Sequence, residues 1–418
     1  MLVINPKRVN EEIEEKPHWY NYYAGYSHSF AKSIIDSSEL SESSIILDPW
    51  NGAGTTTLMS SISGYKSIGV DLNPVMKVIS TAKQAARKDV EYIERKLSQL
   101  SEVRLRKILE DDSLRYWFRD SGVLAIRKVE RWILDGARYS SMVKKVDSLS
   151  APQCVLYTAL FNCVREYLKG FIPSNPTWIK KPKSDDEKVD IEWRAFKGRY
   201  AFVVSEMLKG LRLEEHVWPS DRASLMIASS ANLPLSDEFV DLVLSSPPYC
   251  TRIDYGVATL PELAIIVGSN VGEMDDVRRV LMGTTTISKD VLFQDVSNLG
   301  GKCAKFLDDV KGHSSKASAT YYYKNLLKYF LDLNRSLDEI SRVMRGGAKF
   351  VCVVQDSFYK DVHCDLPSII VEVAFNSGLR LDQRFDFESK QNMANLNVKS
   401  RSYRTQTVAY ESVLIFTK

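Results

Sequence analysis

The sequence predicts an α/β fold in which a mainly helical domain interrupts a largely parallel β-sheet. Residues 44–74 read as strand, turn, helix and strand, because two short apolar runs that each end in an acid flank a Gly- and Thr-rich turn. Residues 75–218 then change to densely charged segments with helical periodicity. Further strand-like runs follow at residues 239–247, 348–356 and 411–418. The simplest organisation is one sheet domain that is built from both ends of the chain.

The length and composition allow this two-domain organisation. The chain has 418 residues, 44% of them hydrophobic, which is enough to bury a sizeable core. We place the sheet domain at residues 1–80 and 219–418, and the inserted helical domain at residues 81–218. The formal net charge is only +3, so any basic surface has to be local.

Two segments of the second half have a texture of their own. Residues 322–344 have helical periodicity, and Gly346 and Gly347 just after them predict the end of that helix. Residues 283–320 are rich in Ser, Thr and Gly. We interpret them as a mobile loop, either one that closes over a substrate or a simple linker.

The cysteines and the N-terminus bear on the environment of the protein. None of the six cysteines forms a C-x-x-C pair, and no His stands at ligand spacing from a Cys, so we expect no zinc or other metal site. The first residues lack the apolar core of a signal peptide, and no apolar run reaches the roughly 18 residues that span a bilayer. We therefore expect a cytoplasmic protein with reduced cysteines.

The turn after the first predicted strand, residues 48–56, reads DPWNGAGTT. Gly52 and Gly54 let the backbone bend tightly and approach a ligand, and the helix start offers free N–H groups to an anionic group. Asp71 closes the next strand about 20 residues on, where an acid can accept both hydroxyl protons of a ribose. A glycine turn without a ligand is the alternative. Neither dinucleotide spacing nor a G-K-[ST] sequence follows, so the turn favours S-adenosylmethionine over NAD or ATP.

A second motif, Ser245-Ser246-Pro247-Pro248-Tyr249, follows the apolar run that ends at residue 244. The prolines cannot continue a strand ladder, and they fix the direction of the preceding carbonyl. The Ser246 and Pro247 oxygens are suited to bind the protons of a flat exocyclic amine, and Tyr249 is suited to stack on its ring. A base in such a pocket has to leave its duplex. The alternative is a proline-stiffened turn that only closes the strand.

Together these motifs resemble those of the DNA methyltransferases that modify amino groups, either N4 of cytosine or N6 of adenine. The resemblance covers about residues 17–80 and 225–418, including the aromatic segment from His18 to Ile35. It implies a Rossmann-like S-adenosylmethionine-dependent methyltransferase sheet. The cofactor-binding residues that it implies, together with the hydroxyl discussed next, are Asp48, Pro49, Gly52, Gly54, Thr55, Thr56, Asp71, Asn73 and Ser230; the catalytic residues are Ser246, Pro247, Pro248 and Tyr249.

The resemblance has one departure. Many members of the family carry an acid before the Ala-x-x-Leu-Pro segment, where it contacts the adenine of the cofactor. Ser229 and Ser230 stand there in this sequence. We expect a hydroxyl, that of Ser230, to take over this contact.

The inserted helical domain is the candidate for reading DNA. Residues 83–150 contain 16 Lys and Arg against 11 Asp and Glu, an excess that suits contacts with phosphates. The loop that follows places Asn175, Trp178, Lys180 and Lys181 close together, and Asn and Lys side chains can read base edges. We expect these four residues to bind DNA. A solvated amphipathic bundle with a plain surface loop is the alternative.

The sequence-based prediction is thus a site-specific methyltransferase that acts on N4 of cytosine in double-stranded DNA, in the cytoplasm and associated with the nucleoid. The serine form of the catalytic motif is associated in the family mainly with cytosine. The resemblance also implies a restriction-modification or phage-defence setting, with a restriction endonuclease or another defence protein as partner. The alternatives are an adenine N6 enzyme, an RNA or protein-amide methyltransferase, and a DNA-binding module without catalysis.

Overall fold

The computed structural model describes most of the chain, and the statements below refer to that part. The described residues are 1–7, 19–21, 25–100, 105, 107–173, 178–213, 222–250, 254–284, 287, 289–389 and 409–418. Among them, no helix is both long enough and apolar enough to cross a membrane.

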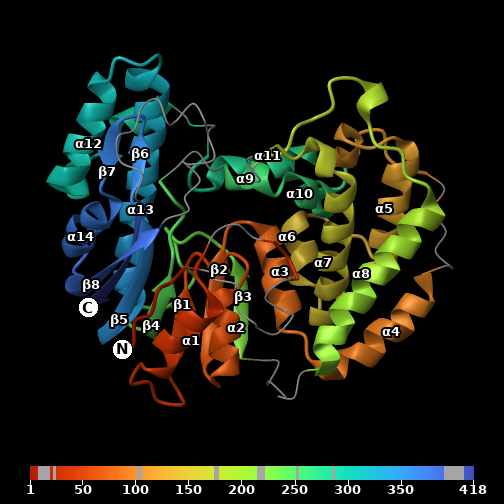
Figure 1. The fold of residues 1–418 in the computed structure, drawn as a ribbon, viewed down its shortest axis with the longest axis horizontal. Helices are drawn as coiled ribbons and strands as arrows, with labels where there is room; N and C mark the ends of the chain where they lie inside the picture. Colours follow the sequence, from red (N-terminus) through yellow and green to blue (C-terminus); the bar gives the residue numbers. More distant parts are fainter. Residues whose placement is uncertain are drawn as a thin grey trace.

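A seven-stranded sheet forms one half of the molecule (Figure 1). Its strands stand in the order β3-β2-β1-β4-β5-β9-β8. The first five of these are parallel, whereas β9 is antiparallel to both β5 and β8. Their bounds are β1 Ile45–Asp48, β2 Lys66–Asp71, β3 Ala223–Ile227, β4 Val240–Ser245, β5 Met344–Gln355, β8 Arg380–Ser389 and β9 Ala409–Thr417. The predicted Rossmann-like methyltransferase sheet is confirmed.

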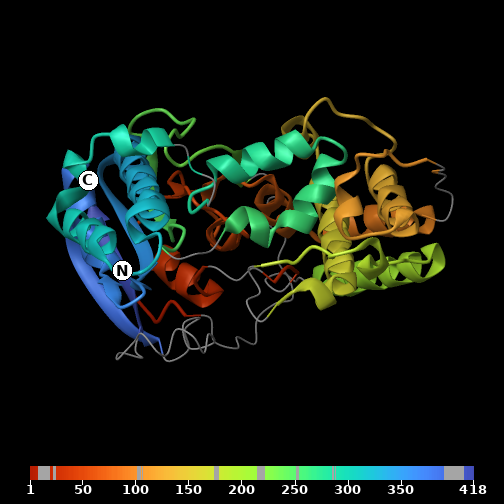
Figure 2. The same ribbon diagram turned by 90° about the horizontal axis from the view of Figure 1, so that it is seen from above.

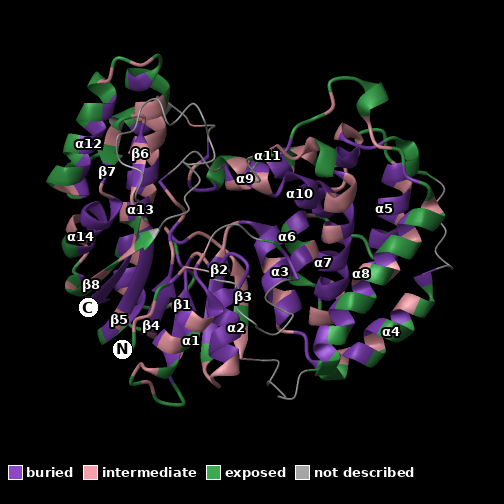
Figure 3. Cartoon of the chain, in the orientation of Figure 1, coloured by how far each residue is buried: buried purple, intermediate pink, exposed green. Residues whose placement is uncertain are grey.

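Helices cover both faces of this sheet, because alternate strand residues point to opposite sides. On β1, Ile46 packs against α1 and α2, whereas its neighbour Leu47 belongs to the cluster on the other face, under α12, α13 and α14. The bounds are α1 His28–Asp36, α2 Thr55–Ile62, α12 Gly300–Gly312, α13 Tyr323–Val343 and α14 Leu366–Asn376. The central strands are buried almost completely, as Figure 3 shows.

The other half of the molecule is helical and has a hydrophobic cluster of its own. Its longer helices are α3 Pro74–Lys83, α4 Val90–Ser98, α5 Asp120–Ile133, α6 Met142–Asp147, α7 Ala151–Tyr167 and α8 Trp193–Leu213. Three more, α9 Tyr255–Ala258, α10 Leu260–Val267 and α11 Val271–Val280, follow β4 and lie between the two halves (Figures 1 and 2). Exposed residues mark the outer sides of α4 and α8 (Figure 3).

The division at residues 80 and 218 stays a prediction, and the packing of two elements cuts across it. Helix α3 follows β2 in the βαβ unit, yet Val75, Val78 and Ile79 of this helix belong to the cluster of the helical half. Helix α10, which we had assigned to the sheet domain, contributes Leu263 and Ile266 to the same cluster.

Local capping explains where several of these helices begin. The Asn73 side chain accepts a hydrogen bond from the Val75 amide at the start of α3, where Pro74 occupies the first position. Ser150 and Gln153 form a capping box at the start of α7. The Ser27 hydroxyl caps α1 in the same way. These caps fix the ends of the helices that surround the sheet edge described below.

Two expectations for the second half of the chain were wrong. Residues 283–320 are not simply a loop, because they contain α12 and the short 3-10 helices Lys289–Phe293 and Ser297–Leu299. Helix α13 ends at Val343, before the two glycines, and Gly346 and Gly347 lie inside β5. Gly347 has a φ of 81° and lets that strand bend.

The remaining elements are small. A hairpin of β6 Ser357–Tyr359 and β7 Val362–Cys364 stands apart from the main sheet. A π-helical turn, Ser318–Tyr322, leads into α13. The described chain also has 3-10 turns at Arg87–Asp89, Ser113–Tyr116, Lys169–Phe171 and Asp185–Glu187.

Candidate active site

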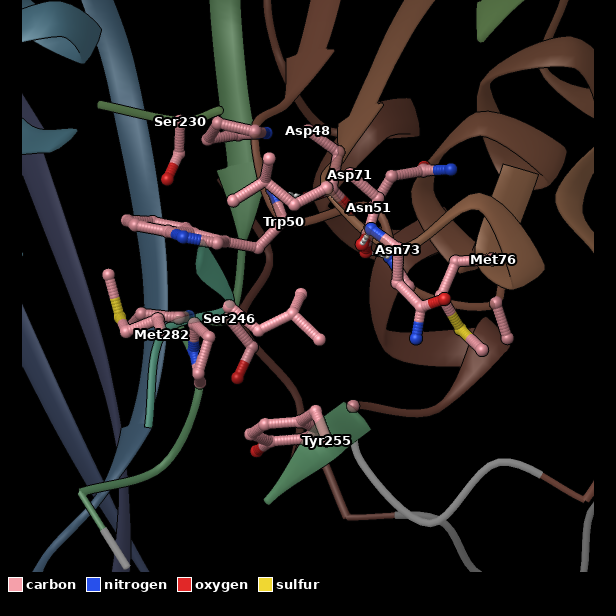
Figure 4. A pocket seen from close by; sticks show the side chains of 18 of the residues that line it. Asp48, Trp50, Asn51, Asp71, Asn73, Met76, Ser230, Ser246, Tyr255 and Met282 are labelled. Atoms are coloured by element: carbon pink, nitrogen blue, oxygen red, sulfur yellow. Dashed lines mark hydrogen bonds between the residues drawn. The ribbon is translucent and has the colours of Figure 1, made fainter. Parts of the chain in front are cut away.

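A cavity opens at the carboxyl ends of β1, β2 and β4, which is where open α/β sheets bind ligands. It encloses about 960 Å³, counting the part that is open to solvent. The sheet lines it with Asp48, Pro49, Trp50, Asn51, Gly52, Ala53, Thr55, Asp71, Leu72, Asn73, Ala228, Ser230, Ser246, Pro247, Pro248 and Tyr249. Gly25, Tyr26, Met76, Tyr255, Thr259, Leu281 and Met282 complete the wall. The two motifs singled out in the sequence therefore share one space (Figure 4).

Asp48, at the end of β1, holds the floor of the cavity together. One carboxylate oxygen accepts from the Ser245 hydroxyl and from the Trp50 amide, and the other accepts from the Thr56 hydroxyl. The Tyr26 hydroxyl contacts that of Thr56. Burial raises the pKa of Asp48 to about 6, against the effect of these hydrogen bonds. Since the chain itself occupies both oxygens, we interpret Asp48 as the anchor of the turn.

The glycines of the turn have different surroundings. Gly52 lines the cavity with a φ of 47°, in the left-handed region that favours glycine. Gly54 has a φ of 81° and does not line the cavity, and a Cβ atom there would lie 2.7 Å from the Cβ of Ser80 in α3. Gly54 thus allows α2 and α3 to approach each other. Thr56 likewise lies behind the cavity wall, fully buried.

Asp71 and Asn73 form the opposite side of the cavity (Figure 4). The Asp71 carboxylate accepts from the Gly52 amide at 2.9 Å and from the Asn73 amide at 2.8 Å. Burial raises its pKa to about 6. Each oxygen has a lone pair left for a hydroxyl donor. The Asn73 amide donates to the Thr259 hydroxyl at 2.8 Å and so ties this edge to the start of α10.

Ser230 and Trp50 lie on one side of the cavity, together with Met282 (Figure 4). The Ser230 hydroxyl bonds to that of Ser336 on α13 at 2.9 Å. The indole N–H of Trp50 is buried and has no acceptor among the described residues. We did not single out Trp50 in the sequence. Its place inside the glycine turn, two residues before Gly52, was the available signal.

The Ser245–Tyr249 loop is held by its backbone. The Pro248 carbonyl accepts from the Tyr329 hydroxyl at 2.8 Å, and the Tyr249 amide donates to the Tyr255 hydroxyl at 3.1 Å. In contrast, the Ser246 hydroxyl and the Pro247 carbonyl make no hydrogen bond with the part of the chain that the structure describes. The loop therefore presents two free acceptors to the cavity from a fixed backbone.

Tyr255, Thr259 and Met282 are site residues that sequence reasoning did not find. They come from the segment after the Pro-Pro-Tyr motif, which folds back over the cavity as α9, α10 and the end of α11. Burial raises the pKa of Tyr255 to about 12, so its hydroxyl stays neutral. Nothing in the local sequence announces this return of the chain.

The predicted DNA-binding loop lies away from the cavity wall, on the helical half. Trp178 is exposed at its surface, and Lys180 and Lys181 are exposed as well. The Lys180 carbonyl accepts from the Trp117 indole, and the Lys181 ammonium lies 3.6 Å from the centroid of the Tyr116 ring. Asn175 lies outside the described residues.

Comparison with known proteins gives three related sequences of one kind. Over 312 residues the chain is 24% identical to the Type II methyltransferase M.BsoBI of Geobacillus stearothermophilus, covering 70% of this chain and 60% of that protein. It is 23% identical to M.MvaI of Kocuria varians over 401 residues, covering 87% and 82%. It is 22% identical to M.AvaI of Nostoc sp. over 398 residues, covering 87% and 79%.

Other comparisons add little to this. No protein-family profile matches the chain. A geranyl diphosphate methyltransferase solved with its cofactor superposes with a TM-score of 0.35 at 8% identity, covering 93% of this chain and 84% of that one, and a score this low carries no inference. Over most of its length the chain is therefore similar to Type II methyltransferases, in agreement with the sheet that its strands form.

Proposed function

We propose that this protein is a site-specific DNA methyltransferase that transfers a methyl group from S-adenosylmethionine to the exocyclic amino group of a base. One observation carries the proposal: Gly52 and Asp71 line the same cavity as Ser246 and Tyr249. A cofactor at the turn and a base at the Pro-Pro-Tyr loop would thus meet in one space. The similarity to Type II methyltransferases supports the same activity.

The residues of the turn fit this cofactor. Free amides at the start of α2 and the bend at Gly52 suit its carboxylate. The remaining lone pairs of Asp71 suit the ribose hydroxyls. The unpaired indole N–H of Trp50 suits an acceptor of the bound cofactor or base. When bound, S-adenosylmethionine supplies an electrophilic methyl group.

The loop acts on the amine in this proposal. Delocalisation into the ring makes the amine a poor nucleophile, and acceptors that bind both of its protons draw the nitrogen toward a pyramidal, reactive form. The Ser246 hydroxyl and the Pro247 carbonyl are the two unengaged acceptors. Because Tyr329 and Tyr255 fix the backbone around them, they need little rearrangement during the reaction.

We assign the target atom as N4 of cytosine in double-stranded DNA. Ser246 is a short neutral hydroxyl, and cytosine is the smaller of the two amino bases to which the motif applies. N6 of adenine is the alternative. In this proposal the enzyme marks a recognition sequence within a restriction-modification or phage-defence system, with a restriction endonuclease as its partner.

Mass spectrometry of nucleosides tests the assignment. Plasmid DNA, treated with purified protein and cofactor, is digested and scanned for methylated bases, and total RNA is treated in parallel. We expect N4-methylcytosine in the DNA alone. N6-methyladenine would overturn the choice of base and leave the reaction standing, whereas methylated RNA with unmodified DNA would overturn the substrate class.

A further inference from the structure

Arg278 stands beside the mouth of the cavity without a fitting partner. It lies near the end of α11, just before Leu281 and Met282 line the wall. Its side chain crosses the start of α9, where a Cβ atom on Gly256 would lie only 2.6 Å from the Cγ of Arg278. The bare backbone at Gly256 therefore gives this arginine its path.

The guanidinium of Arg278 makes no hydrogen bond with the described part of the chain. The nearest carboxylate oxygens belong to Asp275 at 3.5 Å and Asp254 at 3.9 Å, both beyond N–H···O bonding distance. Its Nε is buried and has no acceptor. By contrast, the guanidinium of Arg127 donates to two carboxylates and two carbonyls. A half-buried arginine with five unused donors is poised for an acceptor from outside.

A second cation faces Arg278 from the helical half. Loss of hydration lowers the pKa of Lys181, and the neighbouring charge of Arg278 lowers it further, with Asp275 opposing. The loop that carries Lys181 is fixed, because the Lys180 carbonyl accepts from Trp117 and the Lys180 amide donates to Phe171. Two like charges are therefore held near one another, a strain that an anion between them would relieve.

We propose that Arg278 and Lys181 together bind a backbone phosphate of the DNA strand whose base enters the cavity, an inference that rests on the proposed function. A phosphate brings several acceptor oxygens, which match the fork of an arginine and the point charge of a lysine. The site joins the candidate recognition loop to α11, whose end lines the cavity. It thus places a phosphate contact next to the flipped nucleotide.

The salt dependence of DNA affinity tests this site. Arg278→Ala combined with Lys181→Ala lowers the slope of log affinity against log salt by about 1, as expected for one lost phosphate contact, and weakens binding of plasmid DNA. Arg279→Ala is the matched control, since Arg279 is the next residue, is exposed and pairs with Asp276 at 3.2 Å. We expect the slope of that control to equal the wild-type slope.

The outcomes separate this inference from the proposed function. If the wild type methylates DNA and the double variant keeps the wild-type slope, the phosphate site is wrong and the function stands. If the wild type methylates no DNA, the function itself fails. Unchanged thermal melting and cofactor affinity show that the variants are folded. Should Arg278→Ala misfold, Arg278→Lys with Lys181→Ala replaces it, and the same fall in slope is required.

A second measurement locates the phosphate. Single methylphosphonate substitutions, which remove one charge at a time, are placed along a duplex that carries the methylated sequence. One position near the target base should weaken wild-type binding and leave binding by Arg278→Ala unaffected. Equal losses for both proteins at every position would overturn the site.

Discussion

Asp48 and Asp71 show how residues with the same sequence signature come to serve different purposes. Both are acids that end a buried strand, and burial raises the pKa of each to about 6. The hydroxyls of Ser245 and Thr56 saturate Asp48 from within the chain, whereas only backbone amides bind Asp71. Sequence reasoning placed both at the cofactor, because strand position alone does not reveal which hydroxyls fold back onto which acid.

The pH dependence of cofactor affinity tests the role of Asp71. An ionised carboxylate accepts from ribose hydroxyls better than a protonated one, so affinity should fall as the pH drops through about 6. Asp71→Asn should bind the cofactor on the order of 10-fold or more weakly at pH 8, as expected for a lost charge-assisted hydrogen bond. Its affinity should also lose this pH dependence. Calorimetry between pH 5 and 8 measures both, and a pH-independent wild type would contradict the assignment.

Ser245 and Ser246 allow a matched comparison within the catalytic loop. Ser246→Ala removes a free acceptor, so we expect methyl transfer to fall by about 10²–10³-fold with cofactor affinity unchanged. Ser245→Ala removes the buried bond to Asp48 and should lower the free energy of unfolding by about 1–2 kcal/mol, with a smaller effect on transfer. Single-turnover assays and urea unfolding separate the two. Equal losses of transfer would argue against a direct role for Ser246.

At the scale of elements, α10 connects the cavity to the helical half. Its first end is tied to the sheet by the Thr259–Asn73 bond. At its last end, Arg127 donates to the carbonyls of Ala264 and Ile265, which helices otherwise leave unpaired. Arg127 also pairs with Asp112 and Glu130 in a buried network. The site therefore depends on an element whose far end is fixed well outside the cavity.

Arg127→Leu tests this network. The change leaves two carboxylates buried without their cation, so we expect the free energy of unfolding to fall by about 3–5 kcal/mol. Arg199→Ala is the control, since it breaks the more exposed Arg199–Glu166 pair and should cost less than about 1 kcal/mol. Urea titration measures both. A similar small loss for the two variants would show that the buried network adds little.

The elements that the sequence predicted correctly are those with uniform patterns. The apolar runs of β1, β2 and β4 and the periodicity of α13 were all found. Helix α12 was missed because Ser, Thr and Gly dominate the composition around it. Its buried residues Cys303, Phe306, Leu307 and Val310 nevertheless follow helical spacing. Strand β8 has few buried residues, and β3 is short, so neither gives a strong local signal.

At the scale of the whole molecule, the two halves share elements. The apolar side of α3 packs into the helical cluster, although α3 belongs to the βαβ unit that forms the cofactor turn. The buried Glu262 of α10 accepts from Tyr20 in the N-terminal segment and from Arg165 in α7. Sequence texture located the insertion but could not show this shared packing, because it depends on contacts between residues far apart in the chain.

This shared packing predicts that the two halves unfold together. Trp117 and Trp132 lie in the helical half, so intrinsic fluorescence reports largely on that half. The cofactor binds at the sheet edge in our proposal, and a ligand at 100 times its dissociation constant stabilises the folded state by about 2.7 kcal/mol. In a single cooperative unit, the fluorescence midpoint should rise in urea by the same amount as the circular dichroism midpoint. ATP at the same concentration, for which the turn lacks the phosphate-binding sequence, should leave both midpoints unchanged. If the cofactor moves the circular dichroism transition alone, the helical half unfolds independently, and the packing of α3 and α10 does not couple the halves.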